Sequence, residues 1–166
     1  MAEKQSVLVD IIDGAIAGAV ATWIMGKVTT LLYEREGTIA RSREDSARHG
    51  QTAYGVAADK VAKFLGHSLS DDERQRQGEA IHWALGIGAG ALYGVLRPRV
   101  AASSAAAGLA FGGVFWLVMD ETATPLLGLT PGPKAFPWQT HARGLAGHLV
   151  YGTVANAALA RLEHGA

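Results

Sequence analysis

The chain has 166 residues, of which 49% are apolar and 18% are charged, and its formal net charge is zero. This length suits a single domain spanning residues 1–166, and a neutral chain without basic stripes does not favour nucleic acid as a partner. Because the sequence contains no cysteine, it has no disulfide, thiolate nucleophile or cysteine-ligated metal. The 21 glycines favour a membrane protein, since glycine weakens helices in water but lets membrane helices pack closely.

Four apolar segments follow one another along the chain, and we predict that each crosses a membrane as a helix. A span needs roughly 20 apolar residues. The first segment reaches that length only by enclosing Lys27, whereas the third is uncharged from Val100 to Met119. The predicted spans are residues 7–33, 79–96, 100–119 and 141–162.

A polar connection, residues 34–78, separates the first two spans. Within it, residues 54–65 carry apolar side chains at intervals of three and four. This period predicts an amphipathic helix that lies either on the membrane surface or on the bundle. Ser70 and Glu73 have the spacing of a capping box, so we expect a helix to begin there and to continue into the second span.

Glycine recurs at four-residue intervals in three of the predicted spans. In an apolar helix this glycine zipper indicates close packing, because the missing side chains bring two backbones into contact. The residues with this predicted role are Gly14, Gly18, Gly86, Gly90, Gly94, Gly108 and Gly112.

The last connection, residues 120–140, holds four of the five prolines and cannot be helical throughout. Arg143 and Arg161 bracket the fourth span as interfacial anchors. Four alternating spans predict an all-α, up-down-up-down transmembrane bundle. Most Lys and Arg residues fall in the first and third connections, so the positive-inside rule places both termini outside the cytoplasm.

Alternating spans bring ionisable groups from four segments to one membrane face. The first span ends near Lys27, the second begins near His82, the third ends at Asp120 and Glu121, and the fourth begins near His148. Charged groups at membrane depth are costly unless they are paired. We therefore expect a polar cluster formed by these five residues.

This cluster has three interpretations. It is a network that fixes helix register, a proton-binding site with histidines beside a carboxylate, or a metal site formed by His82, His148, Glu121 and Glu79. A Lys27 ammonium nearby would oppose cation binding, which ranks the metal site below the proton site. No cofactor is therefore expected, with a transition metal ion as the alternative. His141, seven residues or about two turns before His148, either shares its helix face or is simply a solvated histidine at the end of the loop, the commoner case.

The second hairpin resembles a known family over residues 79–155, and the first span does so over residues 10–35. The motifs that carry the resemblance are His82 with Trp83, Tyr93, FGGVFWLVMDE, PLLGLTP, Pro137 with Trp138, and Gly147 with His148. They are similar to the YagU family of bacterial inner-membrane proteins. The resemblance implies a multi-pass protein of the inner membrane, with no established activity and a suggested link to acid stress.

We therefore expect a YagU-type protein of acid or envelope stress with a pH-responsive cluster. Two alternatives stay open: a membrane metalloenzyme with a histidine and carboxylate metal site, and an accessory subunit whose glycine face docks a larger membrane complex. The sequence leans against an enzyme, since no nucleophile triad or phosphate loop has a supporting context. The expected partners are the lipid bilayer and, through the glycine faces, a second copy or a larger complex.

Overall fold

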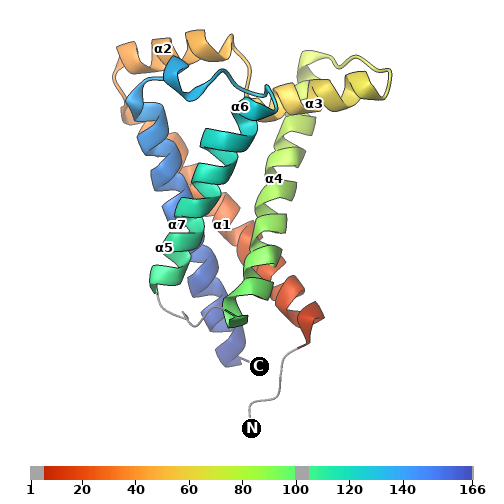
Figure 1. Ribbon diagram of the computed structural model, residues 1–166, viewed down its shortest axis with the longest axis vertical. Coiled ribbons are helices and arrows are strands. Elements are labelled where there is room, and N and C mark those ends of the chain that lie inside the picture. Colours follow the sequence, from red (N-terminus) through yellow and green to blue (C-terminus); the bar gives the residue numbers. More distant parts are fainter. Residues whose placement is uncertain (1–5, 100–104, 166) are drawn as a thin grey trace.

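The computed structural model describes residues 6–99 and 105–165, and this part of the chain is helical without a strand. Four long helices form a bundle: α1 (Val7–Arg35), α4 (Asp71–Leu96), α5 (Ala105–Val118) and α7 (Trp138–Gly165). The start of α1 and the end of α7 lie together at one end of the bundle (Figure 1). The predicted all-α class is confirmed.

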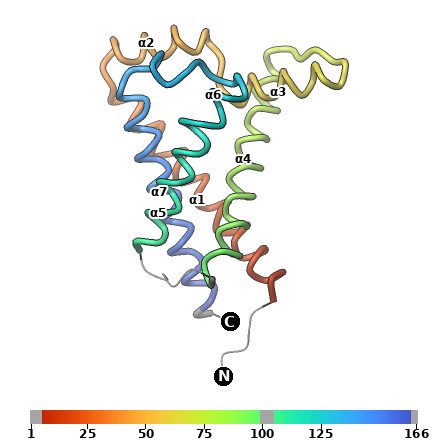
Figure 2. The backbone as a smooth tube through the Cα atoms, viewed as in Figure 1, coloured from red at the N-terminus to blue at the C-terminus, as the bar shows by residue number. Residues whose placement is uncertain are grey.

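The opposite end of the bundle is covered by the connections, and we call it the capped end. It carries two short helices, α2 (Thr38–Arg48) and α3 (Ala53–Phe64). It also carries a π-helix that prolongs α5 (Met119–Ala123), the single turn α6 (Thr124–Leu126) and a 3₁₀ turn (Pro133–Ala135). Figure 2 shows the chain passing from α6 across the capped end to the start of α7.

Glycine backbones form two seams in the bundle. In the seam between α1 and α4, a Cβ on Gly18 would lie 2.7 Å from the Gly86 carbonyl oxygen and 2.9 Å from the Gly90 Cα. In the seam between α5 and α7, a Cβ on Gly112 would overlap the His148 backbone. Glycine is therefore required for these approaches. The predicted glycine faces pack against each other within this one chain.

The interior of the bundle consists mainly of small residues and tyrosines, while large apolar side chains cover the outside. The buried apolar cluster comprises Ala17, Ala21, Tyr93, Tyr151, Ala155 and Leu159. The outer side chains include Leu8, Ile12, Ile16 and Trp23 of α1, Leu85, Leu92 and Leu96 of α4, and Leu109, Val114 and Leu117 of α5. We call this outer set the apolar belt. Water-soluble bundles have the opposite pattern, because they bury their large apolar residues.

A polar network lies inside the uncapped end. Asn156 Oδ1 accepts hydrogen bonds from the Tyr93 hydroxyl at 2.9 Å and from Arg97 Nε at 3.0 Å. The Arg97 guanidinium also pairs with Glu163. Arg97 is only 7% exposed, and these acceptors satisfy its buried charge.

The prediction of four membrane spans is not confirmed. Among the described helices, α1 is the one that is long and apolar enough to cross a membrane, and only 28% of its most apolar window is buried in the protein. One such helix near the N-terminus is by itself weak evidence, because a signal sequence passes the same test. Helix α4 begins with polar turns, α7 carries several charges, and residues 100–104 of the third predicted span lie outside the described residues.

The predicted amphipathic helix at residues 54–65 corresponds to α3. Its buried residues, Gly55, Ala58 and Ala62, are small, and α3 packs against α4. The predicted capping box is confirmed, since the Ser70 backbone donates to Glu73 Oε2 at 2.9 Å and the Ser70 hydroxyl accepts from the Glu73 backbone. This box determines where α4 begins.

Candidate functional site

A polar cavity of about 280 Å³ lies at the capped end. Residues from all four long helices, from α2 and α3 and from the proline-rich loop line it. Its lining carries an unusual number of ionisable groups: Arg48, Tyr54, His82, Asp120, Glu121, His141, Arg143 and His148. This concentration makes the cavity the candidate functional site.

The π-helix after α5 places Asp120 and Glu121 in the lining of this cavity. Its backbone closes at Thr124, whose N–H donates to the Met119 carbonyl five residues earlier. The Thr124 hydroxyl donates to the Asp120 carbonyl at 2.9 Å. A π-helix widens one turn and is frequent at functional sites. Here it gives the cavity two carboxylates that are adjacent in sequence.

His141 is held between two acceptors. Its Nδ1 lies 2.6 Å from Glu121 Oε1, and its Nε2 lies 3.0 Å from the Pro133 carbonyl oxygen. A neutral imidazole has only one N–H, so it cannot donate to both an ionised carboxylate and a carbonyl. Both bonds can therefore form together only when the pair holds one proton more than a neutral ring and a carboxylate. We call His141, Glu121 and Pro133 the His141 clamp; it joins α7 to the π-helix and to the 3₁₀ turn.

A second histidine and carboxylate line the same cavity. His148 is buried, its Nδ1 lies 2.9 Å from the Gly144 carbonyl oxygen and 3.6 Å from Asp120 Oδ2, and its ring meets Phe115 edge-on. Desolvation raises the pKa of the Asp120 carboxyl, against the opposing charge of His148. Gly144 makes room for this pair, because a Cβ there would lie 3.0 Å from Asp120 Oδ2 and 3.1 Å from Trp116 Nε1.

An ion-pair network closes the side of the cavity next to α2. The Arg143 guanidinium pairs with Glu36, and its Nη2 donates to Glu44 Oε1 at 2.7 Å. Glu44 also accepts from Thr140 at 2.9 Å and from Arg48 at 2.8 Å. Burial alone would raise the pKa of the Glu44 carboxyl, but these hydrogen bonds and the two guanidinium charges outweigh it and lower the pKa. The network joins the end of α1 and helix α2 to the first turns of α7.

His82 and Tyr54 form the wall next to α3 and α4. Their ring centroids are 4.8 Å apart, and both residues line the cavity. Burial raises the pKa of the Tyr54 hydroxyl to about 12, with a further contribution from the Asp120 charge. Tyr54 therefore stays neutral throughout the pH range in which histidine changes charge.

The structure brings four of the five residues of the predicted cluster to one cavity: His82, Asp120, Glu121 and His148. It does not bring Lys27 there, because Lys27 is exposed on α1 and is not part of the lining. The partners also differ from those expected. Glu121 contacts His141, and the carboxylate nearest to His148 is Asp120.

The sequence did not predict the contacts of His141 or the ion-pair partners of Arg143. The signal for His141 was its seven-residue separation from His148, which places both near one helix face. The expectation that His141 is simply solvated is wrong, since both its ring nitrogens have acceptors. Arg143 is 10% exposed and ion-paired instead of reaching outward as an interfacial anchor. Its partner Glu44 lies 99 residues away, and no pattern in the sequence links the two.

The predicted metal ligands do not form a metal site. Within residues 6–99 and 105–165, no group of three or more histidine, aspartate or glutamate side chains is placed to hold a metal ion. Glu79 is exposed and lies outside the lining of this cavity. Glu121 is already engaged by His141.

Together these features define an all-helical protein with a helix that can cross a membrane and a polar cavity at one end of its bundle. Residues 51–157 match the family described as "Protein of unknown function (DUF1440)". The match covers more than half of the 166 residues, so the chain belongs to this family. The matched segment contains both histidine–carboxylate pairs, Tyr54 and His82. Comparisons with curated proteins and with solved structures found no match.

Proposed function

We propose that this chain is a multi-pass protein of the bacterial inner membrane, of the YagU type, whose polar cavity responds to pH. The apolar belt supports the membrane location. Leaving one large apolar side chain in water instead of burying it forgoes about 1.5–3 kcal/mol, and the belt holds many such side chains on α1, α4 and α5. Lipid around the bundle removes this cost, while the small buried residues suit close packing between membrane helices.

The packing of the helices supports more than one span. Helix α1 packs against α4 and α7, and α5 packs against α7. If α1 crosses the membrane, its partners are held at the same depth by these contacts. The capped end then lies at one membrane surface. With both termini outside the cytoplasm, as the positive-inside rule favours, the cavity faces the cytoplasm.

The His141 clamp is the observation that supports a response to pH. Both bonds of its ring exist only while the pair carries the additional proton. Histidine ordinarily changes charge between about pH 5 and 8, and loss of the additional proton would remove one of the two bonds. Acid therefore holds the Pro133 turn against the π-helix, and a higher pH loosens the loop over the cavity. A clamp that tightens in acid suits a protein that acts in acid or envelope stress.

Several charged groups lie around the clamp. Asp120 lines the same cavity and adds a second negative charge next to Glu121. The Arg143 guanidinium is paired with Glu36 and Glu44. Arg48 pairs with Glu44 and lies over the Phe136 ring, 5.6 Å from its centroid. The remaining titratable groups of the lining are His148, His82 and Tyr54.

The proposal is tested by histidine-selective ¹⁵N NMR of the protein in nanodiscs between pH 5 and 8. We expect both ring nitrogens of His141 to be protonated at pH 5, with one of them losing its proton as the pH rises. A nitroxide on Lys134→Cys, in a chain that has no other cysteine, should gain mobility over the same range. A nitroxide on Thr153→Cys, which is exposed on α7, is the control. Constant His141 signals together with constant label mobility at residue 134 would refute the pH response.

The membrane location has a separate test. We expect the untagged protein to sediment with membranes and to resist extraction by alkaline carbonate. Recovery in the cytosolic fraction without detergent would contradict the membrane location, whatever the behaviour of the clamp.

A further inference from the structure

Helix α3 extends sideways from the capped end, across the direction of the long helices, and its C-terminal half projects beyond α4 (Figure 1). Its N-terminal half is attached to the bundle. A Cβ on Gly78 of α4 would lie 3.0 Å from the Gly55 backbone nitrogen, and Arg74 of α4 binds Asp59 at 2.6 Å. Past these contacts, α3 has no described helix beneath its free end.

The free end of α3 carries large apolar side chains that the protein does not cover. Phe64 is 90% exposed, Leu65 63% and Val61 54%. At about 100° per residue, these three side chains share one side of the helix, which we call the α3 edge. The α3 edge is separate from the packed side, where Gly55, Ala58 and Ala62 are buried.

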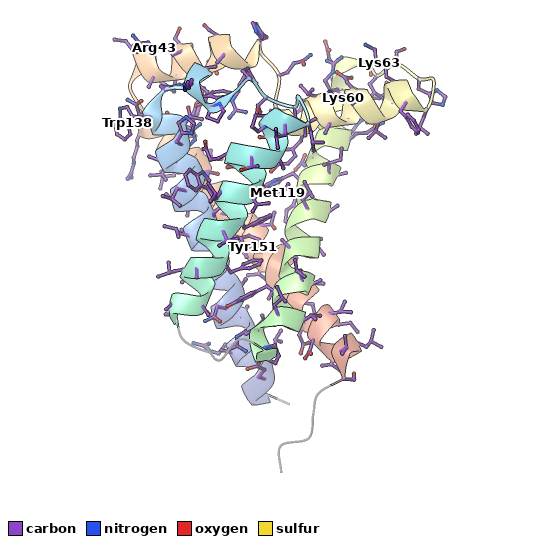
Figure 3. All side chains as sticks on the ribbon, in the orientation of Figure 1. Arg43, Lys60, Lys63, Met119, Trp138 and Tyr151 are labelled. Atoms are coloured by element: carbon purple, nitrogen blue, oxygen red, sulfur yellow. The ribbon has the colours of Figure 1, made fainter. Side chains whose placement is uncertain are left out.

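The α3 edge is directed toward the apolar belt. Lys63 lies about 150° around the helix from the mean direction of the α3 edge. Figure 3 shows Lys63 on the side of α3 that faces away from the long helices. The α3 edge therefore faces back along the bundle, toward the outer surface of α4, where Leu85 and Leu92 are exposed.

The turn after α5 extends the α3 edge. Leu126 of α6 is 81% exposed and Leu127 is 62% exposed. Lys60 of α3 donates to the Leu127 carbonyl at 2.7 Å, which ties this turn to α3. The two segments together present five large apolar side chains at the capped end.

We propose that the α3 edge, with Leu126 and Leu127, inserts into the phospholipid bilayer at the boundary between acyl chains and headgroups. This inference rests on the proposed membrane location. An amphipathic helix parallel to a membrane surface has this arrangement, with apolar residues toward the acyl chains and lysines toward water. Lysine stems can reach the headgroups from that level.

Lipid fits this surface better than a protein partner because the α3 edge continues the apolar belt. Helix α3 projects past the outside of the bundle at the level where the apolar belt ends. If lipid surrounds the belt, the α3 edge meets that lipid. The insertion also bears on the cavity, since Tyr54 at the other end of α3 lines it. Helix α3 thus connects the membrane surface to the cavity wall.

The test uses single-cysteine variants of the full chain in nanodiscs, each carrying a nitroxide. Accessibility to oxygen, which partitions into lipid, is compared with accessibility to a nickel chelate, which stays in water. Phe64→Cys probes the α3 edge, Lys63→Cys is the matched control one residue away, and Val114→Cys on α5, 60% exposed, probes the apolar belt.

We expect the label at residue 64 to be accessible to oxygen and protected from nickel, as the label at residue 114 is, and the label at residue 63 to be accessible to nickel. Nickel accessibility at residue 64 with lipid exposure at residue 114 would overturn the insertion of α3 alone. Protection of residue 64 from both reagents would also overturn it, because a protein partner would then cover the α3 edge. Nickel accessibility at residue 114 would instead overturn the membrane location.

Discussion

Arg143 of α7 donates hydrogen bonds to both carboxylate oxygens of Glu44 of α2, across 99 residues of sequence. Their side chains are 10% and 4% exposed. This contact, with the neighbouring bonds from Thr140 and Arg48, holds α2 over the cavity. Removing one partner of such a pair leaves a poorly solvated charge without compensation.

We predict that Glu44→Gln lowers the free energy of unfolding by about 3 kcal/mol, the lower end of the range for breaking a buried pair, because Glu36 still neutralises Arg143. The measurement is denaturation of the detergent-solubilised protein by dodecyl sulfate. Arg43→Gln, at an exposed position of the same helix, is the control and should change stability little. Equal stability of the Glu44 variant and the control would contradict a stabilising role for this pair.

The same carboxylate gives an expected dependence on pH. The pKa of Glu44 is lower in the folded protein than its ordinary value of 4.5, so the folded state favours the ionised form. Its contribution is complete above the unfolded pKa and is lost as the pH falls through the lower, folded pKa. Unfolding measured from pH 6 downward should therefore show the wild type losing stability below about pH 4.5. Glu44→Gln should lack the part of this loss that comes from protonation of Glu44. If the stability of both proteins fell in parallel with pH, Glu44 would not contribute to the pH dependence.

Glu121→Gln tests the His141 clamp. The amide is nearly isosteric with the carboxylate but has no charge to hold an imidazolium, and hydrogen bonds to charged groups contribute about 1.5–3 kcal/mol. We expect a nitroxide at residue 134 to be as mobile in this variant at pH 5 as in the wild type at pH 8. Glu79→Gln, which alters an exposed carboxylate outside the lining of this cavity, should leave the pH dependence intact. If the Glu121 variant kept the wild-type profile, the clamp would not control the loop.

Gly90→Ala tests the seam between α1 and α4. Its new Cβ would overlap the Gly14 carbonyl oxygen and the Gly18 Cα, and backbone atoms cannot move aside as side chains do. We expect a loss of about 1–3 kcal/mol of unfolding free energy, the range for overpacked positions. Gly88→Ala is the control on the same helix, because a Cβ there meets nothing within 4 Å. Tolerance of alanine at both positions would show that the seam is looser than described.

The sequence predicted the four long helices and α3, but not α2, and it brought four residues of the cavity lining together. Apolar period, glycine spacing and capping residues act within a few residues of each other, so they can be read along the chain. Alternation of four helices then placed His82, Asp120, Glu121 and His148 at one end, because direction alone determines which ends meet. The rise per residue of an α-helix was sufficient to estimate how far each of these residues lies from the end of its helix.

The sequence could not predict which side chains pair. Lys27 was placed near the cavity by its depth, but the rotation of α1 turns it outward. Pairing between Arg143 and Glu44 depends on how α2 folds back over the bundle. No sequence pattern in residues 34–50 predicts that position of α2. The π-helix also escaped prediction, although it changes the direction of both carboxylates. The π-helix has only five residues, which is too few for a hydrophobic period that would distinguish it from an α-helix.

The two glycine seams have a consequence for how far a change in the cavity can spread. Where glycine backbones touch, no side chain lies between the two helices that could change rotamer and absorb a displacement. Sliding or tilting one helix would break the whole line of contacts at once. Each seam therefore resists sliding of its two helices. A displacement of the loop at the capped end would then not be relayed along these seams to the opposite end of the bundle.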